Sequence, residues 1–253
     1  MISVSELAAR LGKAARDRHV ITQLSIEHPE LDLATAYRVQ RELRSTAGPL
    51  AGWKLGVTSR AKQAQVGLTD PIYGFLAAAA AVDLGQRLDT SQLIHPRCEP
   101  EIVFTLARDL DGPHVTAANV IAASSSVAVG IEVLDSRYAD YRFTMTDVVA
   151  DNTSAARYVV GTPVSPQDID LRLSGVVLEK NGTVVATASG AAALGHPAAA
   201  VAWLARQLSA AGEALRAGEI VLSGGLTVAV PVGPGDVVAA SIDRLGSLEL
   251  GCC

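Results

Sequence analysis

The sequence of 253 residues has few aromatic residues and few cysteines. Aromatic side chains make up 4% of the chain although 49% is hydrophobic, so a core must be built from Ala, Val, Leu and Ile. The three cysteines include the adjacent Cys252 and Cys253. They provide neither a disulfide framework nor the spacing of a zinc site.

The chain also lacks a basic excess and a long apolar run. Its formal net charge of −5 and the absence of a basic cluster argue against nucleic acid as a partner. No apolar run approaches the roughly 20 residues of a membrane span, and the N-terminus lacks the regions of a signal peptide. We therefore expect a cytoplasmic protein that binds neither nucleic acid nor membrane.

The pattern that remains favours an α+β fold in two parts. Ser3 and Glu6 form a possible capping box, a second helix is expected from Asp32, and Gly48-Pro49 would end it. From residue 50, short apolar runs separated by Gly, Pro and Asp indicate strands. The expected strands cover residues 101–107, 127–134, 157–160, 174–180, 183–188, 219–222 and 236–242, and a helix begins at Pro197. We predict a helical arm over residues 1–49, packed on a β-rich catalytic core over residues 50–253.

Three glutamates lie inside apolar, strand-like segments. Glu99 and Glu101 are two residues apart, so on a strand they point to the same face, and Glu132 must come from a neighbouring strand. Ionised carboxylates are costly to bury without a cation, and their oxygens suit Mg²⁺ or Mn²⁺. The alternative for Glu99 and Glu101 is a solvated face, but the apolar flanks of Glu132 leave it no obvious route to water.

Lys54 is also flanked by apolar residues, in the run GWKLGVTS over residues 52–59. Glycines on both sides permit close backbone approach. Burial lowers the pKa of a lysine, so Lys54 could donate a proton or bind a substrate carboxylate. The alternative is a lysine at a strand end whose ammonium group reaches water.

Arg137 follows the strand-like segment of Glu132, in the sequence DSRY. Loops at strand ends concentrate functional groups, and an arginine there could hold a substrate carboxylate by two hydrogen bonds. Arg137 could equally be a structural partner of Asp135 or Asp140.

Asp151 and Thr227 complete the candidate substrate-binding residues. Asp151 precedes Asn152, and this pair also suits a simple turn. Thr227 ends the run SGGLT, in which backbone N–H groups could face an anion. A plain glycine turn is the alternative.

Several segments together resemble the fumarylacetoacetate hydrolase superfamily. They are GWKLGVTSRAK, DPIYGFL, HPRCEPEIVF, GIEVLDSRYADYRF, VVADNTSAARYVVG, HPAAAVAWLA, GEIVLSGGLT and a late GD turn. The closest likeness is to the hydratase and decarboxylase branch, which includes 2-oxopent-4-enoate hydratases and 2-oxohex-3-enedioate (4-oxalocrotonate) decarboxylases. The resemblance covers nearly the whole chain.

The resemblance implies a β-rich mixed-sheet roll of the superfamily's C-terminal-domain type with N-terminal helices, working as an oligomer. It implies a Mg²⁺ or Mn²⁺ site at Glu99, Glu101 and Glu132 and an active-site lysine at Lys54. DSRY and GGLT look more like the decarboxylases, so we expect metal-dependent decarboxylation of a 2-oxo dicarboxylate. The alternatives are a 2-oxopent-4-enoate hydratase and a non-catalytic partner subunit of such a hydratase. The resemblance also implies a possible complex with a related hydratase, because decarboxylases of this branch associate with hydratases.

Overall fold

The computed structural model describes residues 3–59, 63 and 70–253. Residues 60–62, the end of the GWKLGVTSRAK motif, lie outside the described residues. The helices are α1 (Val4–Asp17), α2 (Leu24–Glu27), α3 (Leu33–Thr46), α5 (Ala117–Ala123), α6 (Met145–Ala150) and α7 (Pro197–Ala210). Short 3₁₀ turns are η1 (Ala78–Ala80), η2 (Thr90–Gln92), η3 (Ala139–Tyr141), η4 (Asn152–Ser154) and η5 (Gly190–Ala192). In the part of the chain that is described, no helix is both long and apolar enough to cross a membrane.

Two sheets form the centre of the molecule. The first has seven strands in the order β2-β1-β8-β3-β4-β5, with β9 paired to β3, and the second has the order β11-β10-β6-β7. Their strands are β1 (Leu50–Gly56), β2 (Ile72–Ala77), β3 (Arg97–Leu106), β4 (Ser124–Leu134), β5 (Ala155–Val160), β6 (Gly175–Lys180), β7 (Thr183–Ser189), β8 (Ile220–Leu222), β9 (Val230–Pro231), β10 (Val237–Ile242) and β11 (Gly246–Gly251). Only the pair β1 and β8 is parallel among the described pairings, so the first sheet is mixed.

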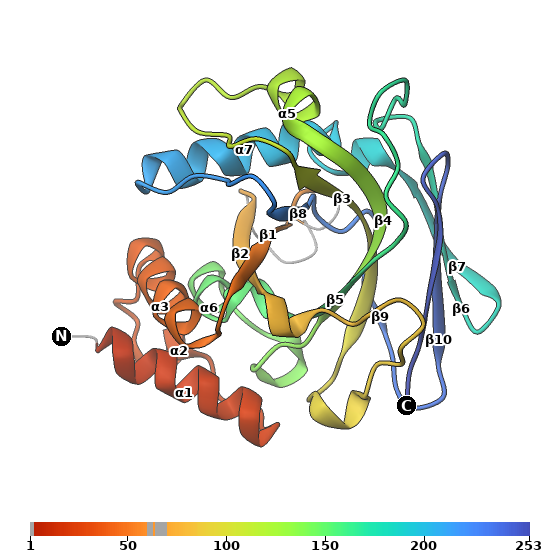
Figure 1. Ribbon diagram of the computed structural model, residues 1–253. Helices are drawn as coiled ribbons and strands as arrows, with labels where there is room; N and C mark the ends of the chain where they lie inside the picture. Colours follow the sequence, from red (N-terminus) through yellow and green to blue (C-terminus); the bar gives the residue numbers. More distant parts are fainter. Residues whose placement is uncertain (1–2, 60–62, 64–69) are drawn as a thin grey trace.

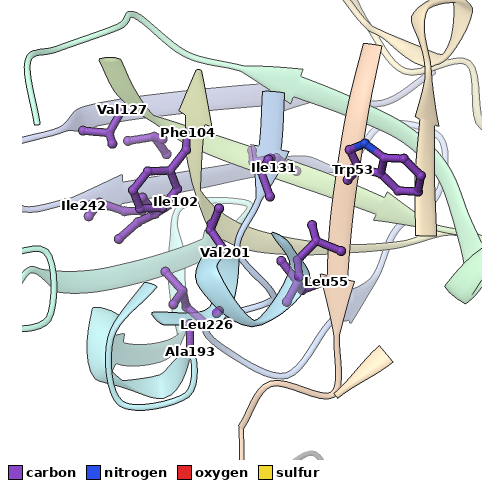
Figure 2. Close-up of a cluster of buried hydrophobic side chains, with 14 of the residues drawn as sticks. Trp53, Leu55, Ile102, Phe104, Val127, Ile131, Ala193, Val201, Leu226 and Ile242 are labelled. Atoms are coloured by element: carbon purple, nitrogen blue, oxygen red, sulfur yellow. The ribbon is translucent and has the colours of Figure 1, made fainter. Parts of the chain in front are cut away.

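Side-chain alternation gives the first sheet two different faces. Residues such as Leu55, Ile102 and Ile131 point into the main core, together with α7 and the second sheet (Figure 2). The residues directly before Leu55 and Ile102, Lys54 and Glu101, lie on the other face, because successive strand side chains point to opposite sides. The polar face of β1, β3 and β4 therefore lies opposite the apolar face that holds the fold together.

The N-terminal helices pack on the edge of the first sheet next to β1 and β2 (Figure 1). Ala36 and Val39 of α3 are fully buried, in one cluster with Val149 of α6. The amide of Gln40 donates hydrogen bonds to the carbonyl oxygens of Tyr73 and Val149, each at 2.9 Å, and so joins α3 to β2 and α6. The division into a separate arm and core stays a prediction.

The predicted α+β class with N-terminal helices is confirmed, and the predicted strands match β3 to β8 and β10 closely. The predicted strands over residues 174–180 and 183–188 form a hairpin that turns at Asn181, with a φ of 52°, and Gly182, with a φ of 74°. The sequence reading missed α5 and α6, which have seven and six residues. These helices are too short for a clear apolar period, and capping boxes at Thr116 and Thr144 begin them.

Candidate active site

The three glutamates predicted from the sequence meet on the polar face of β3 and β4. Glu99 is paired directly across the ladder with Glu132, and Glu101 with Gly130. One carboxylate oxygen from each glutamate lies within 4.8 Å of the others, and all three side chains are buried. Two like charges opposite each other destabilise a sheet, so this register needs a compensating positive charge.

Lys54 supplies one positive charge from β1. Its Nζ lies 2.7 Å from Glu132 Oε1, and only 2% of the Lys54 side chain is exposed. Lys54 is in register with Leu222, the last residue of the short strand β8, which separates β1 from β3. The Lys54 side chain thus meets a carboxylate on β4, although β8 and β3 lie between β1 and β4 in the strand order.

The carboxylates retain capacity for a further cation. Burial raises the pKa of Glu101 well above its usual value, and the charges of Glu132 and Glu99 add to this effect. Burial also raises the pKa of Glu132, although Lys54 opposes the shift. Glu101 Oε1 and Glu132 Oε2 accept no hydrogen bond from any residue in the described ranges.

Among the described residues of the site, three ionised carboxylates and one lysine sum to −2, which one divalent cation would neutralise. Glu101 and Glu132 have buried oxygens without a hydrogen-bond partner among the described residues, and three carboxylates at this separation are the donor set that Mg²⁺ and Mn²⁺ prefer. The site therefore fits a divalent cation, and Glu99, Glu101 and Glu132 are the residues that could hold it.

Gly224 fixes the orientation of Glu101. Its backbone N–H donates a hydrogen bond of 2.6 Å to Glu101 Oε2. Gly224 has a φ of 105°, and a Cβ atom there would lie 2.2 Å from Thr58 Oγ1. A side chain at this position would be strained and would clash, so the run SGGLT requires a glycine here.

The short turn η4 contacts the same ammonium group of Lys54. The lysine Nζ donates to the carbonyl oxygen of Thr153 at 3.1 Å. Asn152, Thr153 and Ser154 all have positive φ, of 49°, 55° and 57°. Such backbone is costly for residues with a side chain, and it persists where surrounding contacts enforce it.

The contacts that enforce this turn come from β2. The Asn152 side chain accepts a hydrogen bond from the Phe75 N–H at 2.9 Å and donates one to the Phe75 carbonyl at 3.0 Å. Thr153 Oγ1 donates to the Tyr73 carbonyl at 2.9 Å. The Asn152 side chain thus bonds to β2 as the backbone of a neighbouring strand would. Gly74 leaves space for this side chain, since a Cβ atom at position 74 would lie 2.8 Å from Asn152 Oδ1.

A cavity of about 520 Å³ opens beside the carboxylates. Lys54 and Glu99 lie in its wall, and Ser154 adds a buried hydroxyl that no described residue partners. Arg97, Tyr141 and Arg142 line the same cavity. The cavity is large enough for a small organic acid.

Arg137 and Asp151 lie elsewhere. They form a buried ion pair with each other, and both line a different cavity, of about 400 Å³, between the N-terminal helices and β2 and β5. Arg137 Nη1 also donates to the Asp135 carbonyl at 2.6 Å, and the carboxylate that Arg137 pairs with is that of Asp151 rather than that of Asp135 or Asp140. Burial raises the pKa of Asp151 to about 6 despite the arginine.

Thr227 is buried next to the site, and its hydroxyl donates to the Val228 carbonyl at 3.1 Å. Val228 lines the cavity, whereas Thr227 is not among its lining residues in the described chain. The substrate-binding roles of Arg137, Asp151 and Thr227 stay predictions.

Sequence reasoning did not single out Arg97, Tyr141, Arg142 or Ser154. Arg97 could have been found from its spacing, because it lies two residues before Glu99 and so shares its face of β3. Ser154 carries no such signal, because the positive φ of its turn follows from contacts with β2.

A family model described as "Fumarylacetoacetate (FAA) hydrolase C-terminal" matches residues 51–251. The chain is 43% identical over 251 residues to a 4-oxalocrotonate decarboxylase of Pseudomonas sp. (strain CF600), covering 97% of this chain and 95% of the relative. It is 40% identical over 252 residues to a 2-keto-4-pentenoate hydratase of Burkholderia vietnamiensis (strain G4 / LMG 22486), covering 98% of this chain and 96% of the relative.

Among solved structures, a 4-oxalocrotonate decarboxylase from Pseudomonas putida G7, complexed with magnesium and adipate, superimposes with a TM-score of 0.96. It is 41% identical, and the match covers 100% of this chain and 99% of that one. The resemblance predicted from the motifs is therefore confirmed.

Proposed function

Because this chain belongs to the fumarylacetoacetate hydrolase family, we propose that it is a divalent-metal-dependent carboxy-lyase. Its substrate would be 2-oxohex-3-enedioate (4-oxalocrotonate), and its products 2-hydroxypenta-2,4-dienoate and CO2, as a step in the breakdown of aromatic compounds. The observation that carries the proposal is the group of three buried carboxylates beside Lys54. The names of the relatives support the choice of reaction.

In this proposal Glu99, Glu101 and Glu132 hold Mg²⁺ or Mn²⁺. When bound, the cation would act as a Lewis acid toward the carboxylate and 2-oxo oxygens at one end of the substrate. Gly224 keeps Glu101 directed at the cation site through its N–H.

The substrate needs no organic cofactor as an electron sink. The bond to the distal carboxylate breaks, and its electron pair passes through the C3–C4 double bond to the 2-oxo oxygen. CO2 leaves, and a proton completes the enol. Lys54 is the group that holds or donates this proton, because its Nζ lies in the cavity wall with hydrogen bonds to fix it.

Hydration is the second candidate, since a hydratase relative covers the chain nearly as completely. Purified protein with Mg²⁺ would be incubated with 2-oxohex-3-enedioate and, separately, with 2-hydroxypenta-2,4-dienoate. We expect CO2 from the first and no hydration of the second. Hydration of the second without CO2 from the first would contradict the proposal, and inactivity toward both would favour a non-catalytic subunit.

We further propose that the working form is a cytoplasmic homo-oligomer that associates with a related hydratase. The 2-hydroxypenta-2,4-dienoate formed would be the substrate of that hydratase. Arg137 and Asp151 would act in this form by fixing the segment between β4 and β5.

A further inference from the structure

The charged residues that line the cavity beside the carboxylates differ in exposure. Lys54 and Glu99 are buried, whereas Arg97 is half-buried and Asp140 and Arg142 are exposed. The formal charges of these three more exposed residues of the described lining sum to +1, which suits an anion.

Arg97 is the better fixed of the two arginines. Its guanidinium carbon lies 4.0 Å from the centroid of the Tyr141 ring, a cation–π contact. The Tyr141 hydroxyl donates to the carbonyl oxygens of Leu134 at 3.0 Å and His95 at 3.2 Å, so the ring is held in place. Within the described ranges, the Tyr141 ring is the contact found for the Arg97 guanidinium, and no hydrogen bond or ion pair to a described residue occupies its N–H donors.

The spacing of Arg97 matches the length of the proposed substrate. Arg97 and Glu99 share a face of β3 and are two residues apart, and two strand residues span about 7 Å. The two carboxylates of a six-carbon dicarboxylate are joined by five bonds of about 1.5 Å, which extend over about 6 Å. A substrate held at the cation site by its 2-oxo acid end would therefore present its far carboxylate near Arg97.

We propose that Arg97, supported by Tyr141 and assisted by Arg142, binds the distal carboxylate and selects 2-oxo dicarboxylates over 2-oxo monocarboxylates. This inference rests on the proposed function, because it takes the 2-oxo acid end to be held at the cation site. A guanidinium that is fixed before binding loses less freedom when the carboxylate arrives. Arg97 is a specificity residue that contacts the leaving carboxylate.

The test compares two ligands that cannot lose CO2, 2-oxohexanedioate and 2-oxohexanoate, by calorimetric titration of the Mg²⁺-loaded protein. Only the first has a distal carboxylate. We expect the wild type to bind it about tenfold to hundredfold more tightly. In Arg97→Met this preference is lost while 2-oxohexanoate binds as before, and Arg97→Lys keeps part of the preference. Arg172→Met, an exposed arginine outside the cavity, serves as the control.

Turnover provides a second readout. Arg97→Met should raise KM for 2-oxohex-3-enedioate by about tenfold without lowering kcat, since the carboxylate that Arg97 contacts in the bound substrate loses its charge as CO2 leaves. Equal affinity of the wild type for both ligands, or an unchanged preference in Arg97→Met, would overturn the assignment of Arg97 and leave the proposed function standing. Failure of the wild type to bind either ligand would overturn both.

Discussion

Lys54 contacts both a carboxylate of the site and the carbonyl of a strained turn. Its ammonium group lies 2.7 Å from Glu132 Oε1 and 3.1 Å from the Thr153 oxygen. A buried lysine with two oxygen partners has few rotamers, so its proton is held at a defined place. In the proposed reaction this fixes where the product enol is protonated.

Lys54→Met should reduce kcat by about a hundredfold, because it removes the proton donor while keeping a chain of similar length. The affinity for Mg²⁺ should not weaken, since the Lys54 ammonium group that competes with Mg²⁺ for Glu132 is removed. Turnover and calorimetric Mg²⁺ binding measure the two effects. Loss of Mg²⁺ binding would instead mean that Lys54 organises the carboxylates, and unchanged turnover would remove it from the mechanism.

At the scale of elements, the left-handed turn η4 links the sheet edge to the site. Asn152 pairs with both backbone groups of Phe75, and the turn brings the Thr153 carbonyl to Lys54. The positive φ of these residues is enforced by β2. The turn therefore depends on long-range contacts, and a local reading of the sequence could identify Asn152 only as turn-compatible.

Asn152→Ala should destabilise the protein by about 2–4 kcal/mol, because two buried backbone groups of Phe75 lose their partners. Urea unfolding measures this loss. Asn119→Ala is a suitable control, since it removes only the surface hydrogen bonds that Asn119 Oδ1 accepts from the Thr116 N–H and hydroxyl at the start of α5, and it should cost about 1 kcal/mol. A loss for Asn152→Ala no greater than that of the control would show that η4 does not need these bonds.

Asp236 connects the start of β10 to the β6–β7 hairpin. It accepts hydrogen bonds from Asn181 Nδ2 at 2.8 Å and the Gly233 N–H at 2.9 Å, and it pairs with Lys180 at 2.9 Å. These contacts lower the pKa of Asp236 to about 2 from its usual 3.8. A lowered pKa in the folded state means that the stabilisation is present above pH 3.8 and lost as the pH falls toward 2.

Asp236→Asn should therefore cost about 1 kcal/mol at pH 7, after allowance for solvent screening near the surface. The difference from the wild type should shrink as the pH falls from 4 toward 2. Urea unfolding at pH 7, 5 and 3 measures it. A difference that is constant across this range would show that the charge of Asp236 does not contribute.

At the scale of the whole molecule, much of the fold and part of the site could be predicted from sequence. The strands around Glu101 and Glu132 have strong apolar patterns, and the spacing of Glu99 and Glu101 places them on one face. The sequence does not encode locally that β8 ends beside Lys54, or that Arg137 meets Asp151 across a loop. Those contacts depend on strand order and register, which arise only when the chain is folded.

Mg²⁺ should raise the melting temperature of the whole protein. At about 100 times its dissociation constant, a ligand that binds only the folded state adds about 2.7 kcal/mol. For a chain of this size this corresponds to about 5–10 °C. Glu101→Gln should abolish the shift, with a metal-free melting temperature close to that of the wild type, since a neutral group suits its burial. The control Glu249→Gln, an exposed change on β11, should keep the Mg²⁺-dependent rise in melting temperature. A full rise in Glu101→Gln would reject Glu101 as a metal ligand.

The most direct test is a crystal structure of the Mn²⁺-loaded protein with 2-oxohexanedioate, with the metal located by anomalous scattering. We predict one peak about 2.0–2.2 Å from a carboxylate oxygen of each of Glu99, Glu101 and Glu132, with the 2-oxo acid end of the ligand on the same ion. A peak elsewhere, or a ligand that binds without contact to the metal, would contradict the account.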